Sequence, residues 1–233
     1  MEAIASGQYE LNKKRLKLDK VNIYRFFRHL LPIYFWCIPN DRKEIYLSFD
    51  DGPTPELTEI ILNLLSKKNV KATFFLVGEN VLKYPDLYNS ILKEGHRVGN
   101  HTFNHLKGWK TPKNEYVENV RKASKYINSN LFRPPYGRIS NKQGKRLKLD
   151  YKIIMWSILT RDYDKKISPE ECLSRAKKAR SGDIIVFHDH LKAQENMLYA
   201  LPRFIDFAHE KGFVFKTIPE IEYVPSRMLK MDT

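Results

Sequence analysis

The feature that most constrains the fold is a repeated change of hydrophobic period along the chain after residue 40. Residues 45–49 form a short apolar run of the kind found in buried strands. Residues 55–68 then carry apolar side chains at the spacing of one helix face. Because strands that alternate with helices run in the same direction, this pattern predicts an α/β fold with one parallel sheet.

The alternation continues to residue 218 with no composition shift, internal repeat or low-complexity linker. Further strands are expected at residues 72–77, 97–100, 131–133, 152–157, 183–187 and 213–218. Further helices are expected at residues 85–94, 112–127, 141–149, 169–180 and 196–209. Seven or eight such units would be enough to close into a barrel, in which functional side chains gather at the carboxyl ends of the strands.

Polar and titratable side chains occur at these predicted strand ends. They are Asp50, Asp51, His101, His105, Arg133, Asp162, His188 and Asp189. Because the ends of parallel strands share one edge of the sheet, we expect these side chains to lie in one cleft. The pattern therefore predicts an enzyme active site.

Asp50 and Asp51 are adjacent, follow a strand-like run and precede a Gly-Pro turn. The backbone turns at the end of a strand, so both carboxylates can enter one cleft with different roles. Asp-Asp-Gly-Pro is also an ordinary loop composition, and Asp51 is suitably placed to cap the following helix. This stretch alone leaves both interpretations open.

His101 and His105 are four residues apart, and we expect one helical turn to bring both imidazoles to one face. Asp51 is a natural third ligand, and imidazole with carboxylate suits Zn²⁺ and related divalent metals. Three protein ligands leave a position open for water and substrate, as in catalytic rather than structural sites. A pair of exposed histidines on a helix is the alternative, which the presence of Asp51 disfavours.

A water molecule activated by a metal must lose a proton as it attacks, and Asp50 is the candidate base. His188 is placed to act as the acid for the leaving group. Asp162 is expected to hold the imidazole of His188 in its protonated form. The alternative for His188 is a hydrogen-bonded core histidine at a strand end.

Residues 133–137 (R-P-P-Y-G) are typical of a rigid turn. Pro134 and Pro135 carry no N–H, which leaves the N–H of Tyr136 as the available donor. A fixed N–H beside a metal would form half of an oxyanion hole. Arg133 is expected to orient Asp50, whereas a plain proline turn with a surface arginine is the alternative.

Forty-one Lys and Arg against 27 Asp and Glu give a formal net charge of +14 over 233 residues. Such a field favours nucleic acid, an anionic membrane surface or an acidic polysaccharide. No zinc finger, helix-turn-helix or aromatic-basic RNA motif accompanies it, so nucleic acid is disfavoured as a partner. Cys37 and Cys172 are the only cysteines and predict neither a disulfide framework nor a cysteine metal site.

The first 40 residues carry no pattern of a cleavable signal, because residues 1–20 are polar. Residues 21–39 are apolar and aromatic, but charged residues and Pro32 leave the run too short to cross a bilayer. We expect its aromatic residues to pack against the domain. An interfacial helix in peripheral contact with a membrane is the alternative. A cytoplasmic or membrane-peripheral location is the default expectation.

Together the motifs resemble those of the polysaccharide deacetylases of the NodB-homology type, carbohydrate esterase family 4. The segments similar to family motifs, in family order, are residues 48–53 (S-F-D-D-G-P), 101–105 (H-T-F-N-H), 133–137 (R-P-P-Y-G), 156–162 and 186–189 (V-F-H-D). The resemblance covers roughly residues 43–217, and nothing before residue 40 takes part in it.

The resemblance implies a single-domain, distorted (β/α) barrel, similar to a TIM barrel, of seven to eight strands. It also implies a metal-dependent hydrolase, with zinc as the expected ion, that removes acetyl groups from N-acetylated amino sugars. By position, Asp50 would be the base and His188 the acid, and the Tyr136 amide would be the oxyanion donor. Arg133 and Asp162 would tune the base and the acid. The implied metal ligands are Asp51, His101 and His105.

The fourth motif departs from the family pattern D-x-x-D-W. Leu159 replaces its first acid and Tyr163 its tryptophan, whereas Asp162 is retained. We expect catalysis to remain and the change to affect the shape of the pocket and the choice of substrate.

The expected substrate is an acetylated glycan, with peptidoglycan or another bacterial glycan preferred and O-acetyl esters left open. A catalytically silent glycan-binding module on the same scaffold is the alternative function, and a binder of nucleic acid or membrane surfaces is a further one. The expected division of the chain is an N-terminal extension (residues 1–40), the deacetylase domain (residues 41–220) and a C-terminal tail (residues 221–233).

Overall fold

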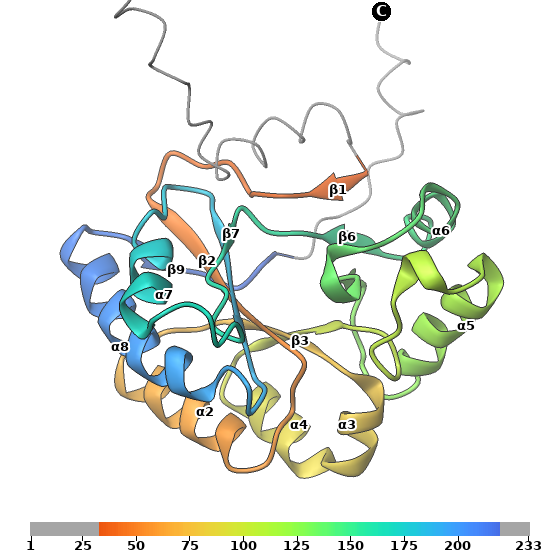
Figure 1. Cartoon of the computed structure of the whole chain (residues 1–233), viewed down its shortest axis with the longest axis horizontal. Coiled ribbons are helices and arrows are strands. Elements are labelled where there is room, and N and C mark those ends of the chain that lie inside the picture. The colour runs from red at the N-terminus through yellow and green to blue at the C-terminus, as the bar shows by residue number, and fades with distance from the viewer. Residues whose placement is uncertain (1–32, 220–233) are drawn as a thin grey trace, which may run out of the picture.

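The computed structural model describes residues 33–219, which form one curved sheet surrounded by helices (Figure 1). The strands are β1 (Tyr34–Phe35), β2 (Glu44–Asp50), β3 (Thr73–Leu76), β4 (Arg97–Asn100), β5 (Leu131–Phe132), β6 (Lys152–Ile154), β7 (Ile158–Leu159), β8 (Ile184–His188) and β9 (Val214–Phe215). The helices are α2 (Leu57–Lys67), α3 (Gly78–Lys83), α4 (Pro85–Lys93), α5 (Lys113–Ala123), α6 (Asn141–Leu147), α7 (Pro169–Ala176) and α8 (Gln194–Glu210).

The sheet runs in the order β1-β6-β5-β4-β3-β2-β8-β7, with β9 paired to β2, and every pairing between these strands is parallel. Within residues 33–219, no ladder joins the two outer strands β1 and β7. The architecture is thus a distorted, incompletely closed (β/α) barrel, which confirms the predicted fold class. In the described part of the chain the sheet has nine strands, one more than the upper end of the expected range.

Strand β2 is central because apolar side chains leave it on both faces. Ile45, Leu47 and Phe49 are fully buried against the outer helices, in a core that includes Leu57 of α2. Tyr46, on the opposite face, belongs to a second core, which also includes Tyr116 of α5 and Leu147 of α6. A parallel strand covered on both faces needs a continuous apolar run, which is what the sequence has here.

Every strand and helix expected after residue 40 is present, with ends that differ by a few residues. The prediction missed β1, β7 and α3. The two strands are only two residues long, too short to carry a periodic signal. Helix α3 begins at Gly78, a residue that the sequence suggests as the end of a strand rather than the start of a helix.

The aromatic segment predicted before residue 40 contributes to the core where the structure describes it. Tyr34 and Trp36 are buried, and β1 pairs with β6. The alternative of an interfacial helix concerns mainly residues 21–32, which lie outside the described residues. The proposed division at residues 40 and 220 stays a prediction. None of the helices in residues 33–219 has the length and hydropathy needed to span a membrane.

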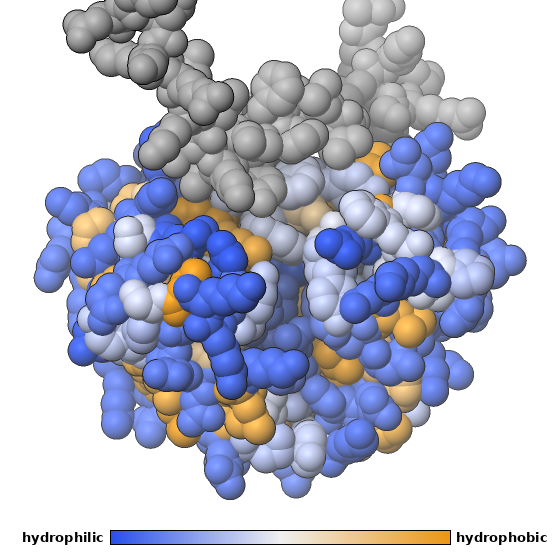
Figure 2. Space-filling view, viewed as in Figure 1, coloured by the Kyte–Doolittle hydropathy of each residue, from blue (hydrophilic) through white to orange (hydrophobic). Residues whose placement is uncertain are grey.

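The face drawn in Figure 2 is mostly hydrophilic, with apolar residues scattered among charged ones.

Cys37 and Cys172 are both free thiols, and Cys172 is buried. The described domain is therefore held together by packing and hydrogen bonds, without a disulfide between its two cysteines.

The register of the parallel strands brings the polar strand ends together. Asp50 at the end of β2 is opposite His188 at the end of β8. Asn100, which precedes His101, is opposite Phe132, which precedes Arg133. The carboxyl edge of the sheet is therefore where the chemistry gathers, as the sequence predicted.

Candidate active site

A cavity of about 470 Å³ opens at the carboxyl ends of the strands. Its lining includes six of the predicted site residues: Asp50, Asp51, His101, His105, Tyr136 and His188. Arg133 and Asp162 are fully buried and contact this lining from behind. The structure thus brings all eight predicted site residues to one place.

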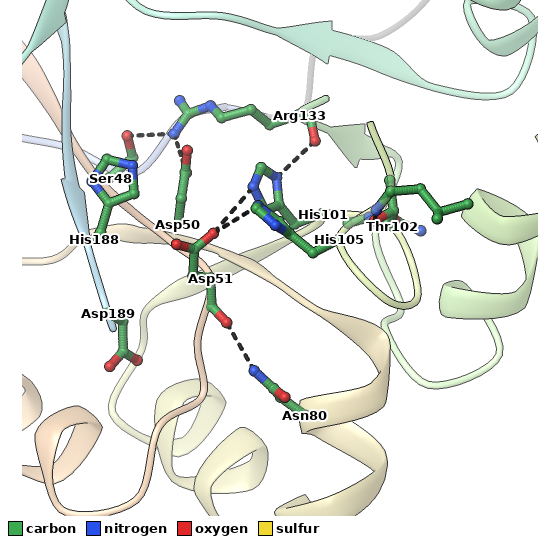
Figure 3. Close-up of polar contacts among 12 residues, drawn as sticks. Ser48, Asp50, Asp51, Asn80, His101, Thr102, His105, Arg133, His188 and Asp189 are labelled. Carbon is green, nitrogen blue, oxygen red and sulfur yellow. Dashed lines mark hydrogen bonds and ion pairs between the residues drawn. The ribbon is translucent and has the colours of Figure 1, made fainter. Parts of the chain in front are cut away.

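Asp51, His101 and His105 form a cluster whose ligand atoms all lie within 4.8 Å of one another. Oδ1 of Asp51 is 3.5 Å from Nε2 of His101 and 3.1 Å from Nε2 of His105, and Figure 3 shows the three side chains converging. One carboxylate and two imidazoles are a donor set suited to zinc and related divalent ions. The residues present therefore fit a divalent metal.

The two histidines are brought together by a loop rather than by the expected helical turn. Residues 101–107 contain no helix, and the backbone of Thr102 and His105 has positive φ values of 67° and 58°. The Oδ1 of Asn100 accepts a hydrogen bond from the Thr102 N–H at 2.8 Å, and its Nδ2 donates to the Val120 carbonyl of α5. The predicted helix was wrong because the side chain of Asn100 fixes a tight loop that residue spacing does not reveal.

His101 is oriented by a backbone contact. Its Nδ1 lies 2.8 Å from the carbonyl oxygen of Arg133, which only accepts hydrogen bonds, so Nδ1 carries the proton. The lone pair is then on Nε2, the atom that points to Asp51. Metal-binding histidines usually donate such a hydrogen bond from the ring nitrogen that does not bind the metal.

Asp51 is held in a conformation that separates it from its neighbour Asp50. Its φ is 79°, and its carbonyl oxygen accepts a hydrogen bond from Nδ2 of Asn80 in α3 at 2.9 Å. Burial opposes its charge, but its contacts with the imidazoles of His101 and His105 and the nearby charge of His188 hold the pKa of Asp51 well below its ordinary value. The carboxylate is thus ionised and ready to bind a cation.

The alternative role of Asp51 as a helix cap is excluded by the structure. The residue before α2 is Glu56, and no side chain caps that helix. Asp51 lies earlier in the chain and faces the two histidines instead.

Asp50 contacts a different partner, the guanidinium of Arg133. Arg133 Nη1 is 2.6 Å from Asp50 Oδ1 and 2.9 Å from the hydroxyl of Ser48, and both charged side chains are almost fully buried. Arg133 also donates to the carbonyl of Met155 and packs on the ring of Phe75. A buried ion pair needs such additional partners to offset its desolvation, and these contacts fix the orientation of Asp50, as predicted.

His188 lies on the other side of the two aspartates from the paired histidines in Figure 3. Its Nδ1 is 2.7 Å from Oδ1 of Asp162, whose Oδ2 accepts the backbone N–H of His188 at 2.7 Å. Burial opposes the imidazolium charge, but the charge and hydrogen bond of Asp162 outweigh it and raise the pKa of His188 to about 9. The predicted pairing of His188 with Asp162 is therefore present.

Tyr136 lies in the turn after β5, where its φ is 60° and its side chain is half exposed. Its ring lies 4.7 Å from that of His105, so the Tyr136 side chain lies beside the candidate metal ligands. The expected oxyanion contact of the Tyr136 backbone N–H stays a prediction.

The roles of two supporting residues, Asn80 and Asp189, are visible only in the structure. Asn80 holds the backbone of Asp51, and Asp189 packs against Gly52, where a Cβ would lie only 2.2 Å from its Oδ2. The Thr58 hydroxyl of α2 donates to that oxygen at 2.6 Å, whereas Oδ1 of Asp189 has no hydrogen-bond partner among the described residues. Burial raises the pKa of Asp189 to about 7. In the sequence, Asp189 was notable only as a polar residue at the end of a predicted strand, and no pattern indicated Asn80.

The departure in the fourth motif faces the cavity. Leu159 and Tyr163 both line it, and the ring of Tyr163 meets that of His188 edge to face at 4.7 Å. An apolar side chain therefore stands where the family pattern has an acid, and the aromatic ring of Tyr163 contacts His188.

Comparison with known proteins agrees with these motifs. The family model for polysaccharide deacetylases matches residues 38–152. A peptidoglycan-N-acetylglucosamine deacetylase of Bacillus cereus is 34% identical over 194 residues, which cover 80% of this chain and 91% of the relative. The Listeria monocytogenes peptidoglycan-N-acetylglucosamine deacetylase PgdA is 31% identical over 185 residues, 77% of this chain but 39% of that longer protein.

Solved structures show the same relationship. The Bc1960 peptidoglycan N-acetylglucosamine deacetylase matches with a TM-score of 0.78 and 33% identity, over 83% of this chain and 94% of that chain. BA3943, described as a family 4 carbohydrate esterase pseudoenzyme from Bacillus anthracis, matches with a TM-score of 0.70 and 25% identity, over 79% of this chain and 67% of that chain. The chain therefore belongs to the polysaccharide deacetylase family, carbohydrate esterase family 4, and its relatives named deacetylases are hydrolases of amide bonds.

Proposed function

We propose that this protein is a metal-dependent deacetylase that removes acetyl groups from the N-acetylated amino sugars of a bacterial glycan, with peptidoglycan as the preferred substrate. One observation carries the proposal. A metal-ligand cluster, an arginine-bound carboxylate and a carboxylate-bound histidine all meet at one cavity. Each of the three parts has a separate role in amide hydrolysis.

Asp51, His101 and His105 would hold the divalent metal, for which zinc is the best match to the donor set. When bound, such an ion supplies Lewis-acid chemistry that polarises the acetyl carbonyl and lowers the pKa of water. The hydrogen bond from His101 to the Arg133 carbonyl and the low pKa of Asp51 both favour the ligand forms of these side chains.

Asp50 accepts the proton from the water that attacks the acetamide carbon. Its carboxylate is fixed by Arg133 and Ser48 rather than by the histidines, so it can act on the water without serving as a ligand. A base held in this way begins each reaction cycle in the same orientation, which preserves the geometry of proton transfer.

The backbone N–H of Tyr136 donates a hydrogen bond to the oxyanion of the tetrahedral intermediate. His188, kept protonated by Asp162, then gives its proton to the sugar nitrogen as the C–N bond breaks. The products are acetate, whose new C–O bond comes from water, and a free amino sugar.

The choice of peptidoglycan rests on the relatives. Several curated relatives are named peptidoglycan-N-acetylglucosamine deacetylases, and another, from Rhizobium leguminosarum, is named a chitooligosaccharide deacetylase. A net charge of +14 favours an acidic glycan over a neutral one. Esters of acetate remain a second candidate substrate, because the same attack on a carbonyl would cleave them.

The presence of the full set of groups argues against a catalytically silent module. The structural relative BA3943 is a pseudoenzyme, and activity has been restored in a mutant of it, so this fold exists in both active and inactive forms. This chain retains Asp50, His188 and all three candidate metal ligands in one cavity. We therefore infer that it is active.

Acetate release from a panel of substrates tests the proposal. Chitin oligomers, purified peptidoglycan and acetylated xylan should be incubated with the protein, with and without a chelator and with zinc added back. We expect acetate from at least one N-acetylated glycan, loss of release with chelator and recovery with zinc. Release from acetylated xylan alone would make the protein an esterase, and release unaffected by chelation would overturn the role of the metal.

A further inference from the structure

Trp109 is a large apolar side chain that is 66% exposed. It lies in the 3-10 turn η1 (Gly108–Lys110), outside the lining of the catalytic cavity. Its Nε1–H donates to the carbonyl of Ile139 at 3.1 Å, so the indole ring is fixed in one orientation. Exposed tryptophans held in this way are common in recognition sites, because a rigid ring loses little conformational freedom on binding.

The turn that carries Trp109 is clamped from beneath. Gln143 of α6 is buried, and its Nε2 donates to the carbonyls of Gly108 and Thr111 at 2.8 and 2.9 Å. Gly108 allows the close packing, since a Cβ there would be 2.4 Å from the carbonyl oxygen of Arg138. The aromatic surface is therefore preorganised, which lowers the cost of binding.

Basic side chains surround the ring. The guanidinium carbon of Arg138 is 5.2 Å from the centre of the Trp109 ring, and Lys107 Nζ is 4.9 Å from the centre of the Tyr136 ring. Lys110 is the third exposed cation of this group. Among residues 33–219, no carboxylate forms an ion pair with any of these three cations. They are thus available to an anionic partner.

Tyr136 connects this surface with the catalytic cavity. It lines the cavity and contacts the ring of His105, while Lys107 lies over its ring and Arg138 follows it by two residues. A polymer with one sugar in the cavity would therefore pass along Tyr136 toward Trp109.

We propose that Trp109, Arg138, Lys107 and Lys110 form a second binding subsite, the Trp109 subsite, for a neighbouring sugar that carries a carboxylate. The apolar face of the sugar ring stacks on the indole, and the carboxylate is bound by the guanidinium of Arg138. The inference rests on the proposed function, and it identifies the substrate class as a glycan strand with acidic sugars rather than a neutral polymer.

Variants of the two central residues test the subsite. The substrates are peptidoglycan strands freed of peptides, the same strands with their carboxyl groups converted to methylamides, and a neutral N-acetylglucosamine pentamer. We expect Arg138→Gln to raise KM about five- to tenfold on the acidic strands and to have little effect on the other two. Trp109→Ala should raise KM about tenfold on all three, and Trp109→Phe should recover most of that loss.

Two controls separate binding from general damage. Arg203→Gln removes another exposed arginine stacked on an aromatic ring, that of Tyr199, in α8 on the opposite side of the molecule from α6 in Figure 1. It should not change KM on any glycan. Hydrolysis of 4-nitrophenyl acetate, which is too small to reach Trp109, should be the same in every variant and shows that the cavity is intact.

The two proposals fail in different ways. If the unmodified protein releases no acetate from any of the three glycans, the proposed function is overturned and the subsite with it. If it is active but Arg138→Gln raises KM equally on acidic and methylamide strands, carboxylate recognition is overturned. If it is active and Trp109→Ala leaves KM unchanged, the stacking surface is overturned while the proposed function stands.

Discussion

Asp50 and Asp51 are neighbours in the chain, but they contact different partners. Arg133 and Ser48 hold Asp50, whereas His101 and His105 face Asp51. The backbone changes direction at Asp51, whose φ of 79° takes the chain out of the β2 strand. Two identical side chains can therefore take the proposed roles of base and ligand, because one residue lies in the strand and the next lies beyond it.

The separation of these two roles can be tested at Asp50. Asp50→Asn keeps the size of the side chain but removes the proton acceptor, so we expect kcat to fall by about 10²–10⁴-fold. The metal ligands are untouched, and elemental analysis should find the same metal content as in the unmodified protein. Asp86→Asn, at an exposed position in α4, is the matched control and should keep full activity. Full activity of Asp50→Asn would show that another group takes the proton.

A second prediction concerns the pH at which activity is lost on the alkaline side. His188 must be protonated to act as an acid, and Asp162 raises its pKa to about 9, so activity should fall as the pH rises through this value. Asp162→Asn removes the charge that opposes the effect of burial. We expect the pH at which kcat/KM falls on the alkaline side to decrease by about two units, to or below the ordinary pKa of histidine.

The pH profile of Asp162→Asn should be compared with that of Asp164→Asn. Asp164 lies two residues away but pairs with Arg161, so its loss should leave the alkaline limb in place. If the alkaline limb is also unchanged in Asp162→Asn, the loss of activity at high pH is not caused by deprotonation of His188.

At the scale of secondary structure, the ends of the strands explain why so much of the site was predictable. Apolar runs identified β2 and β8, a short strand was expected at β4, and the parallel arrangement required the ends of these strands to meet. The roles proposed for Asp50, Arg133 and His188 rest on their chemistry and on their shared position at this edge.

Loops were predictable only in part. The contact between His101 and His105 was expected from a helical turn, but a loop with positive φ at Thr102 creates it. The loop depends on Asn100, which bonds to Thr102 and to α5, and a contact between distant segments leaves no periodic signal. The same reason explains why Asn80 was missed: its role depends on α3 packing beside the Asp51 backbone.

Asp189 links three elements and gives a prediction at this scale. It follows β8, packs on the loop after β2 and accepts the Thr58 hydroxyl of α2. In the unfolded chain an aspartate loses its proton near pH 4, whereas burial raises the pKa of Asp189 to about 7. Between these values the folded state binds more protons than the unfolded state, so its stability falls as the pH rises.

Asp189→Asn removes this titration. We expect the free energy of unfolding of the variant, relative to the unmodified protein, to increase between pH 5 and pH 7 and then to level off. Denaturant unfolding of chelator-treated protein at pH 5, 6, 7 and 8 measures the difference. The exposed Asp86→Asn serves again as control and should give a constant difference. A constant difference for Asp189→Asn would show that Asp189 is ionised throughout.

At the scale of the whole molecule, the sequence predicted the class of fold but not how it closes. The count of alternating segments indicated a barrel, yet the strand order depends on β1 and β7, which occupy the two edges and carry no periodic signal. The first of these uses Tyr34 and Phe35, in a segment that the family motifs do not reach. The excess of positive charge is likewise a property of the whole surface, and it favours an acidic polymer without identifying one.

A metal bound by Asp51, His101 and His105 would connect the site with the stability of the whole domain. A ligand that binds only the folded state stabilises it, by about 2.7 kcal/mol at a concentration of 100 times Kd. For a domain of this size that corresponds to a rise in Tm of roughly 5–10 °C. We therefore expect chelator to lower Tm and zinc to restore it.

The zinc-dependent rise in Tm also distinguishes ligands from base, because it does not depend on turnover. His101→Ala removes one of the candidate ligands and should lose the rise, whereas Asp50→Asn should keep it while losing activity. The exposed His209→Gln at the end of α8 should keep both. A rise that persists in His101→Ala would place the metal elsewhere, and a rise lost in Asp50→Asn would make Asp50 a ligand. Either result would undo the separation of roles on which the proposed mechanism depends, since the water needs a base that the metal does not occupy.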